Sequence, residues 1–94
     1  MWARIARFEG DPGSVDERLE KLRAMLDSGD FPPELAGATV MLLVDRVSGG
    51  MLGLTLFETE EAMRTGDEAM NRGGGRAGNR SAVEFYEVPI KATL

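Results

Sequence analysis

Hydrophobic and polar residues follow two different periods along this chain, and the switches between them divide it into short elements. Alternation with a period of two predicts four strands, at about 2–8, 38–45, 51–58 and 82–88. Apolar residues at helical spacing predict two helices, at about 15–28 and 60–71. The elements therefore follow one another as strand, helix, strand, strand, helix, strand.

This βαββαβ order predicts the fold class. A single helix cannot bury its own apolar face, so the two halves of the chain must share one core. We expect an α+β protein with a ferredoxin-like βαββαβ two-layer sandwich, in which two helices cover one face of a sheet. A chain of 94 residues is long enough for one domain, 1–94, and little more.

Residues with strong positional preferences mark the ends of both helices. Ser14 followed by Glu17 predicts a capping box, in which each side chain bonds a backbone amide of the first turn. Gly29 predicts a left-handed residue after the last turn of the first helix. Thr59 is expected to cap the second helix, which Gly66 weakens by up to about 1 kcal/mol relative to alanine.

The alternation also predicts which strand residues face the helices. We expect the more uniformly aliphatic set on the covered face: Ile5, Val40, Leu42, Val44, Leu52, Leu54, Leu56, Val83 and Phe85. The open face is then expected to carry Trp2, Arg4, Phe8, Met41, Leu43, Met51, Thr55, Phe57, Glu84 and Tyr86. This set is too apolar to leave in water, so we expect a homodimer through the open sheet face.

Composition narrows the classes of partner and compartment. A net charge of −5 argues against nucleic acid, because binding to phosphates depends on basic groups. The longest apolar run, 40–44, is too short to span a bilayer, and no signal-peptide pattern opens the sequence. With no cysteine and no histidine, we expect no metal site, no disulfide and, by default, a cytoplasmic location.

The candidate chemistry lies on the face expected to be open. Arg4, Glu84 and Tyr86 are the convergent polar groups there and the candidate catalytic residues. The candidate substrate-binding residues are Trp2, Phe8, Thr55, Phe57, Arg76 and Arg80. The alternative is purely structural, with an ion pair and aromatic packing inside a dimer interface. Residues 73–78 match G-x-G-x-x-G, but they follow a helix and precede a strand, which is the wrong context for dinucleotide binding.

The βαββαβ order, the short chain, the apolar second sheet face and the closing strand 83–89 together resemble the dimeric α+β barrel superfamily, especially its antibiotic-biosynthesis-monooxygenase-like branch. The resemblance implies a homodimer and a cofactor-free monooxygenase or isomerase acting on a small aromatic or polyketide-like molecule. In that reading Arg4 holds an enolate or phenolate oxygen, and Glu84 or Tyr86 moves a proton.

Two functional hypotheses therefore follow from the sequence. One is the cofactor-free enzyme implied by the resemblance. The other is a non-catalytic dimeric module that binds a small ligand or serves as a scaffold. Haem-binding members of the superfamily use a histidine ligand, and this chain has none, so we expect no cofactor in either case.

Overall fold

The structure is a computed structural model, and it describes residues 1–73 and 79–94. The described segments contain the elements β1 (Trp2–Glu9), α1 (Val15–Ser28), β2 (Thr39–Val44), β3 (Met51–Phe57), α2 (Glu60–Gly73) and β4 (Asn79–Glu87). Short 3₁₀ turns at Pro12–Ser14 and Pro33–Leu35 flank α1. The predicted order of strands and helices is confirmed, although β4 begins three residues earlier than expected.

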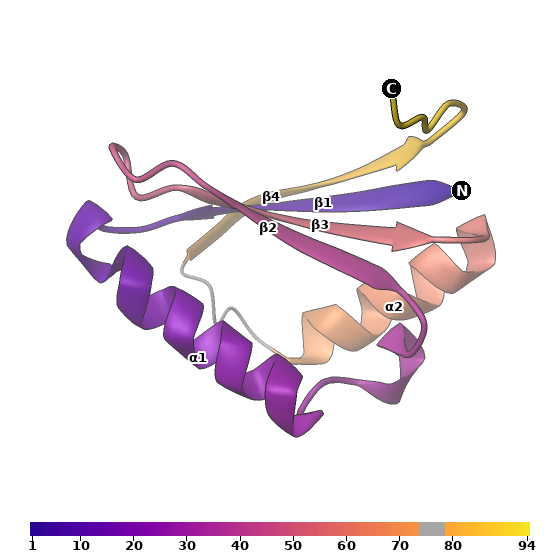
Figure 1. The fold of residues 1–94 in the computed structure, drawn as a ribbon. Coiled ribbons are helices and arrows are strands. Elements are labelled where there is room, and N and C mark those ends of the chain that lie inside the picture. The colour runs from indigo at the N-terminus through magenta and orange to yellow at the C-terminus, as the bar shows by residue number, and fades with distance from the viewer. Residues whose placement is uncertain (74–78) are drawn as a thin grey trace.

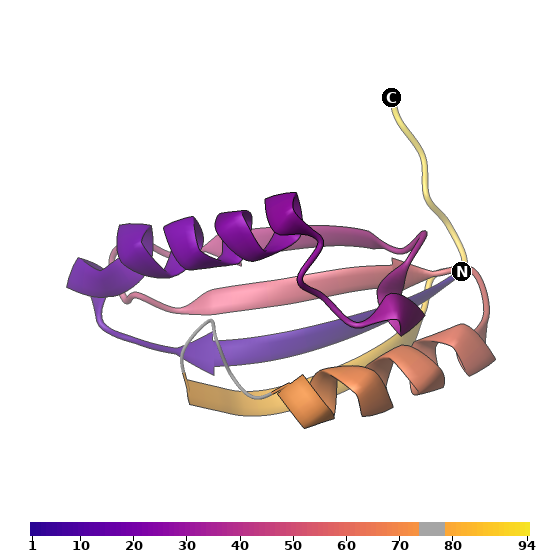
Figure 2. The same cartoon turned by 90° about the horizontal axis from the view of Figure 1, so that it is seen from below.

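The four strands form one antiparallel sheet in the order β2-β3-β1-β4. Both helices lie on the same side of this sheet, and its other side is open (Figure 1). Seen from below, α1 runs under the β2 and β3 side of the sheet, whereas α2 runs under the β1 and β4 side (Figure 2). This arrangement is the ferredoxin-like α+β fold that the sequence predicts.

The first helix begins differently from the prediction. Ser14 precedes α1, but its hydroxyl makes no capping hydrogen bond to the helix. The Ser14 hydroxyl donates instead to the Asp11 carbonyl (2.9 Å) and accepts a hydrogen bond from Arg18 Nε (3.0 Å). The capping box of Ser14 with Glu17 is therefore wrong, because the 3₁₀ turn before α1 and the Arg18 side chain take up that hydroxyl.

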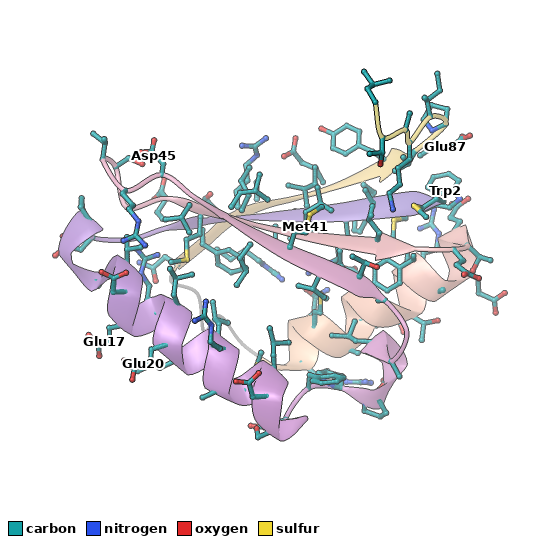
Figure 3. All side chains as sticks on the ribbon, in the orientation of Figure 1. Trp2, Glu17, Glu20, Met41, Asp45 and Glu87 are labelled. Carbon is teal, nitrogen blue, oxygen red and sulfur yellow. The ribbon has the colours of Figure 1, made fainter. Side chains whose placement is uncertain are left out.

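The other predicted helix boundaries are confirmed. Gly29 follows α1 in the left-handed conformation, with φ of 74°, and its amide bonds back to the last turn. The Thr59 hydroxyl accepts a hydrogen bond from the Ala62 amide (3.0 Å), as expected of an N-terminal cap. Glu17 and Glu20 lie on the outer side of α1, away from the sheet (Figure 3), so the polar face of this helix is also as predicted.

The predicted sheet faces are right for β2 and β4 and wrong for β1 and β3. Antiparallel pairing of Arg4 with Thr55 places both side chains on one side of the sheet. Arg4 hydrogen-bonds Asp67 of α2, so that side faces the helices. The helix side of these two strands carries Trp2, Arg4, Ala6, Phe8, Met51, Gly53, Thr55 and Phe57. Their open side carries Ala3, Ile5, Arg7, Leu52, Leu54 and Leu56.

The error has a physical cause. Both β1 and β3 carry large apolar side chains on each face, so hydrophobicity alone does not distinguish the two sides. With the correction, aliphatic residues of β1 and β3 take the place of aromatic ones on the open face, which remains strongly apolar. Met41 of β2 also lies on this face, on the side of the sheet away from the helices (Figure 3), and it is 47% exposed.

Arg18 links the start of α1 to the hairpin between β2 and β3. Its side chain is buried, and Nη2 donates to the Gly49 carbonyl (2.6 Å) and the Asp11 carbonyl (3.2 Å). The guanidinium packs so closely on Gly10 that a β-carbon there would lie 2.6 Å from Arg18 Cζ. One side chain therefore joins the turn before α1 to the β2–β3 hairpin.

We predict that Gly66→Ala destabilises the protein, although helix propensity alone favours alanine by about 1 kcal/mol. The structure gives the reason, because a β-carbon at Gly66 would lie 2.6 Å from the ring of buried Phe57. Overpacking of this kind costs about 1–3 kcal/mol, so we expect a net loss in the free energy of unfolding, measured in urea. Thr65→Ala, at an exposed position of α2, is the control and should be neutral or slightly stabilising. A Gly66→Ala protein more stable than wild type would contradict the packing described here.

Candidate functional site

A cavity of about 1020 Å³ lies between the helix side of the sheet and the two helices. It opens because α1 diverges from the sheet toward its C-terminal end (Figure 1). Burial along α1 follows this divergence, since Val15 is 1% exposed and Leu26 is 40% exposed. The apolar side chains that line the cavity come mainly from Ala6, Phe8, Leu22, Met25, Leu26, Phe31, Pro32, Leu35, Val40, Leu42 and Met70.

Arg4 is the buried charge of this cavity. Its side chain is 4% exposed, and Nε donates to Asp67 Oδ1 (2.8 Å) while Nη1 contacts Met70 Sδ (2.8 Å). Among the described residues Nη2 has no hydrogen-bond partner, and no fully enclosed side-chain nitrogen there lacks one. Nη2 is therefore not fully enclosed, and Arg4 and its strand neighbour Thr55 both line the cavity.

A β-bulge brings a second arginine to the cavity. Along most of the β1–β4 ladder the register is regular, but Arg7 pairs with Ala82 and Phe8 pairs with Arg80. Ser81 is thus an extra residue, and the side chains that precede it in β4 change faces. Arg80 consequently shares a face with Phe8 and lines the cavity, where its Nη1 donates to Asn71 Oδ1 (2.6 Å). Without the bulge Arg80 would project from the open face.

A second polar group lies on the open face. Arg7 Nε donates to Glu84 Oε1 (2.5 Å), and the Tyr86 hydroxyl donates to Glu84 Oε2 (2.8 Å). The hydrogen bond from Arg7, followed by that from Tyr86, lowers the pKa of the Glu84 carboxyl. The same carboxylate raises the pKa of the Tyr86 hydroxyl. These groups satisfy one another, so the cluster presents no unpaired charge within the described residues.

The three candidate catalytic residues do not come together. Glu84 and Tyr86 share the open face as predicted, but Arg4 projects from the opposite side of the sheet. Arg7, three residues further along β1 and on the opposite face from Arg4, occupies the place predicted for Arg4 beside Glu84. The sequence-based pairing of Arg4 with Glu84 is therefore wrong. The even-numbered residues of β1 face the helices, whereas the sequence pattern predicted the odd-numbered residues there.

The candidate substrate-binding residues divide in a similar way. Phe8, Thr55 and Arg80 line the cavity, although Phe8 and Thr55 do so from the helix side rather than the open face. Phe57 is buried against Gly66 of α2, and Trp2 pairs with Phe57 on the same side, so neither lines the cavity. Arg76 lies outside the described residues.

Sequence reasoning missed the side of the cavity formed by α1 and the segment after it, including Met25 and Phe31. It also missed Gly53, which lies in the middle of β3 and leaves room beside Phe8 and Leu42. An isolated glycine inside a strand pattern signals such a space, and it was the available clue.

Two further features concern metal ligands and membrane-spanning helices. In residues 1–73 and 79–94, no group of three or more carboxylate, histidine or cysteine side chains is placed to hold a metal ion. Within the same residues, neither helix has the length and apolar character needed to cross a membrane.

Comparison with known proteins gives no functional assignment. No family model matches the sequence, and no curated protein is similar to it. Among solved structures, the chain is similar to the de novo designed protein Ferredog-Diesel, with 19% identity, a TM-score of 0.48, and coverage of 93% of this chain and 85% of that chain. The ferredoxin-like assignment rests on the strand order and the helix placement given above.

Tyr86 is the only tyrosine of the chain, so its titration can be followed directly by ultraviolet absorbance. We predict a Tyr86 pKa above the ordinary value of 10.0, because Glu84 accepts the hydroxyl hydrogen bond and repels the phenolate. Glu84→Gln should lower the Tyr86 pKa toward 10.0. Glu87→Gln, an exposed carboxylate of the same strand, is the control and should leave it unchanged. Equal titration curves for wild type and Glu84→Gln would show that the cluster does not form.

Proposed function

We propose that this protein binds a small, mainly apolar molecule in the cavity between the sheet and the helices. Ligand sites are typically concave, about 300–1,000 Å³ in volume, and apolar apart from a few placed polar groups. The cavity is of that size, its walls are mainly apolar, and Arg4 and Thr55 are polar groups at its floor. The observation that carries the proposal is the buried Arg4 side chain, which lines a mainly apolar space and whose Nη2 has no hydrogen-bond partner among the described residues.

The distribution of titratable groups favours binding over catalysis. The cofactor-free monooxygenase or isomerase implied by the resemblance needs an oxyanion-stabilising group and a proton-transfer group at one substrate. Arg4 meets the first requirement inside the cavity, whereas Glu84 and Tyr86 lie on the other side of the sheet. Asp67 beside Arg4 is held in an ion pair, and Asp30, which also lines the cavity, has an interaction partner of its own. A non-catalytic ligand-binding module is therefore the function that we propose.

The proposal predicts that filling the cavity abolishes binding. A β-carbon at Gly53 would make ordinary contacts with Phe8 Cε2 (3.7 Å) and Leu42 Cδ2 (3.8 Å), so Gly53→Ala should fold and still bind. Gly53→Leu should fold, because larger residues favour strands, but should occupy the ligand space. Binding of decanol and 2-naphthol is measured through the NMR signals of methyl-labelled methionines. Met25 and Met70 line the cavity, and Met41 on the open face is the internal reference.

We expect both probes to shift the Met25 and Met70 signals in wild type and Gly53→Ala, and not in Gly53→Leu. Shifts confined to Met41, or no shift with either probe, would contradict the proposal. Oxygen uptake measured with a reduced aromatic substrate tests the catalytic alternative on the same samples, and uptake that requires the protein would favour the enzyme.

We further propose that a second copy of the chain covers the open sheet face. Its apolar side chains include Ile5, Met41, Leu43, Leu52, Leu54 and Leu56. Met41 and Leu43 on this face are 47% and 46% exposed, so its apolar side chains meet water in the single chain. A homodimer through this face is therefore supported by its composition and its exposure.

The dimer proposal predicts that a charge at the centre of the open face separates the subunits. Leu54 pairs with Ile5 on one side and Met41 on the other, so it lies in the middle of the sheet. Leu54→Asp should raise the dimer dissociation constant by at least about 30-fold, the effect of losing a central contact of 2 kcal/mol. Sedimentation velocity measures this constant. Val47→Asp, in a turn and 91% exposed, is the control and should leave it unchanged. A wild-type monomer at all concentrations would refute the proposal.

A further inference from the structure

We infer that the ligand of the cavity carries a single carboxylate on an apolar body, and that Arg4 Nη2 receives this carboxylate. The inference rests on the proposed binding function and names the chemical class of the ligand. It depends on how Arg4 is held, on the charges around the cavity and on the bulge that places Arg80.

Asp67 binds only part of the Arg4 guanidinium. Asp67 contacts Arg4 through Nε, the inner nitrogen of the guanidinium, at 2.8 Å. The bond therefore holds the guanidinium through its Nε edge. Nη1 lies against the thioether of Met70, which is a weak acceptor, and Nη2 has no partner among the described residues. A guanidinium buried to this extent normally has strong acceptors for its terminal nitrogens.

Two arginines lie on the sheet side of the cavity. Asp67 balances Arg4, whereas Arg80 Nη1 donates to the neutral amide of Asn71. Asp30 also lines the cavity, but it belongs to the segment after α1 and has an interaction partner of its own. A carboxylate bound along the sheet side therefore meets the positive charges of Arg4 and Arg80.

The cavity is long enough for an elongated ligand. Arg80 pairs with Phe8, which lies four residues along β1 from Arg4, a separation of about 13 Å at the usual strand rise. Between them the sheet floor presents the small residues Ala6 and Gly53, and the α1 side chains form the opposite wall. A carboxylate bound at Arg4 thus leaves an elongated apolar body along this floor. Monocarboxylates with a medium-length alkyl or arylalkyl chain match this shape.

The experiment compares octanoate with octanamide, which has nearly the same shape but no charge, on the wild-type protein at neutral pH. Binding is followed by the Met25 and Met70 methyl signals and by calorimetry. We expect octanoate to bind about tenfold or more tightly than octanamide, as a charge-assisted hydrogen bond to Nη2 requires. Equal affinities would overturn the inference and leave the proposed function standing. Failure of both compounds, together with decanol and 2-naphthol, would refute the proposed function itself.

Variants then assign the preference to Arg4. Arg4→Gln combined with Asp67→Asn removes both charges together, so no unpaired carboxylate is left beside the cavity. This double variant should bind octanamide as wild type does and lose the preference for octanoate. Arg64→Gln removes an exposed cation of α2 and is the matched control, expected to retain the preference. A preference that survives the double variant would overturn the assignment to Arg4, and the wild-type comparison decides the ligand class if that variant does not fold.

Discussion

The ion pair between Arg4 and Asp67 is the interaction on which the rest of the arrangement depends. A cation in the middle of a strand is costly to bury without a partner, and α2 supplies the carboxylate. Arg4 must then face the helices, and alternation along β1 turns Ile5 and Arg7 to the open face. Because Arg4 pairs with Thr55 across the strands, this orientation of β1 also places Thr55 on the helix side and the leucines of β3 on the open face. One ion pair thereby sets the character of both sheet faces.

The two faces consequently have different chemistry. On the helix side, Arg4 and Thr55 form the polar floor of an apolar cavity, as in a ligand site. On the open face, Arg7, Glu84 and Tyr86 satisfy one another and are surrounded by aliphatic residues, as in an interface between subunits. The groups that the sequence suggests for one active site are thus divided between the proposed ligand cavity and the proposed dimer interface.

Much of the fold was predictable because the relevant signals are local. The βαββαβ order follows from periodicity, and Gly29 and Thr59 mark helix ends through their own backbone and side-chain chemistry. The candidate site was predictable only in part, since Phe8, Thr55 and Arg80 do line the cavity. Arg80 was a candidate substrate-binding residue, but the bulge at Ser81 that places it on the cavity side leaves no clear mark in the sequence.

The sequence by itself determined which segments become strands and helices, and that the sheet has two apolar faces, because these depend on residues near one another in the chain. Tertiary structure alone decided which face of β1 and β3 meets the helices. That choice depends on contacts across long separations, between Arg4 and Asp67 and between Phe57 and Gly66. A single step in strand parity exchanges the faces without changing the hydrophobic pattern, so only packing against the helices distinguishes the two arrangements.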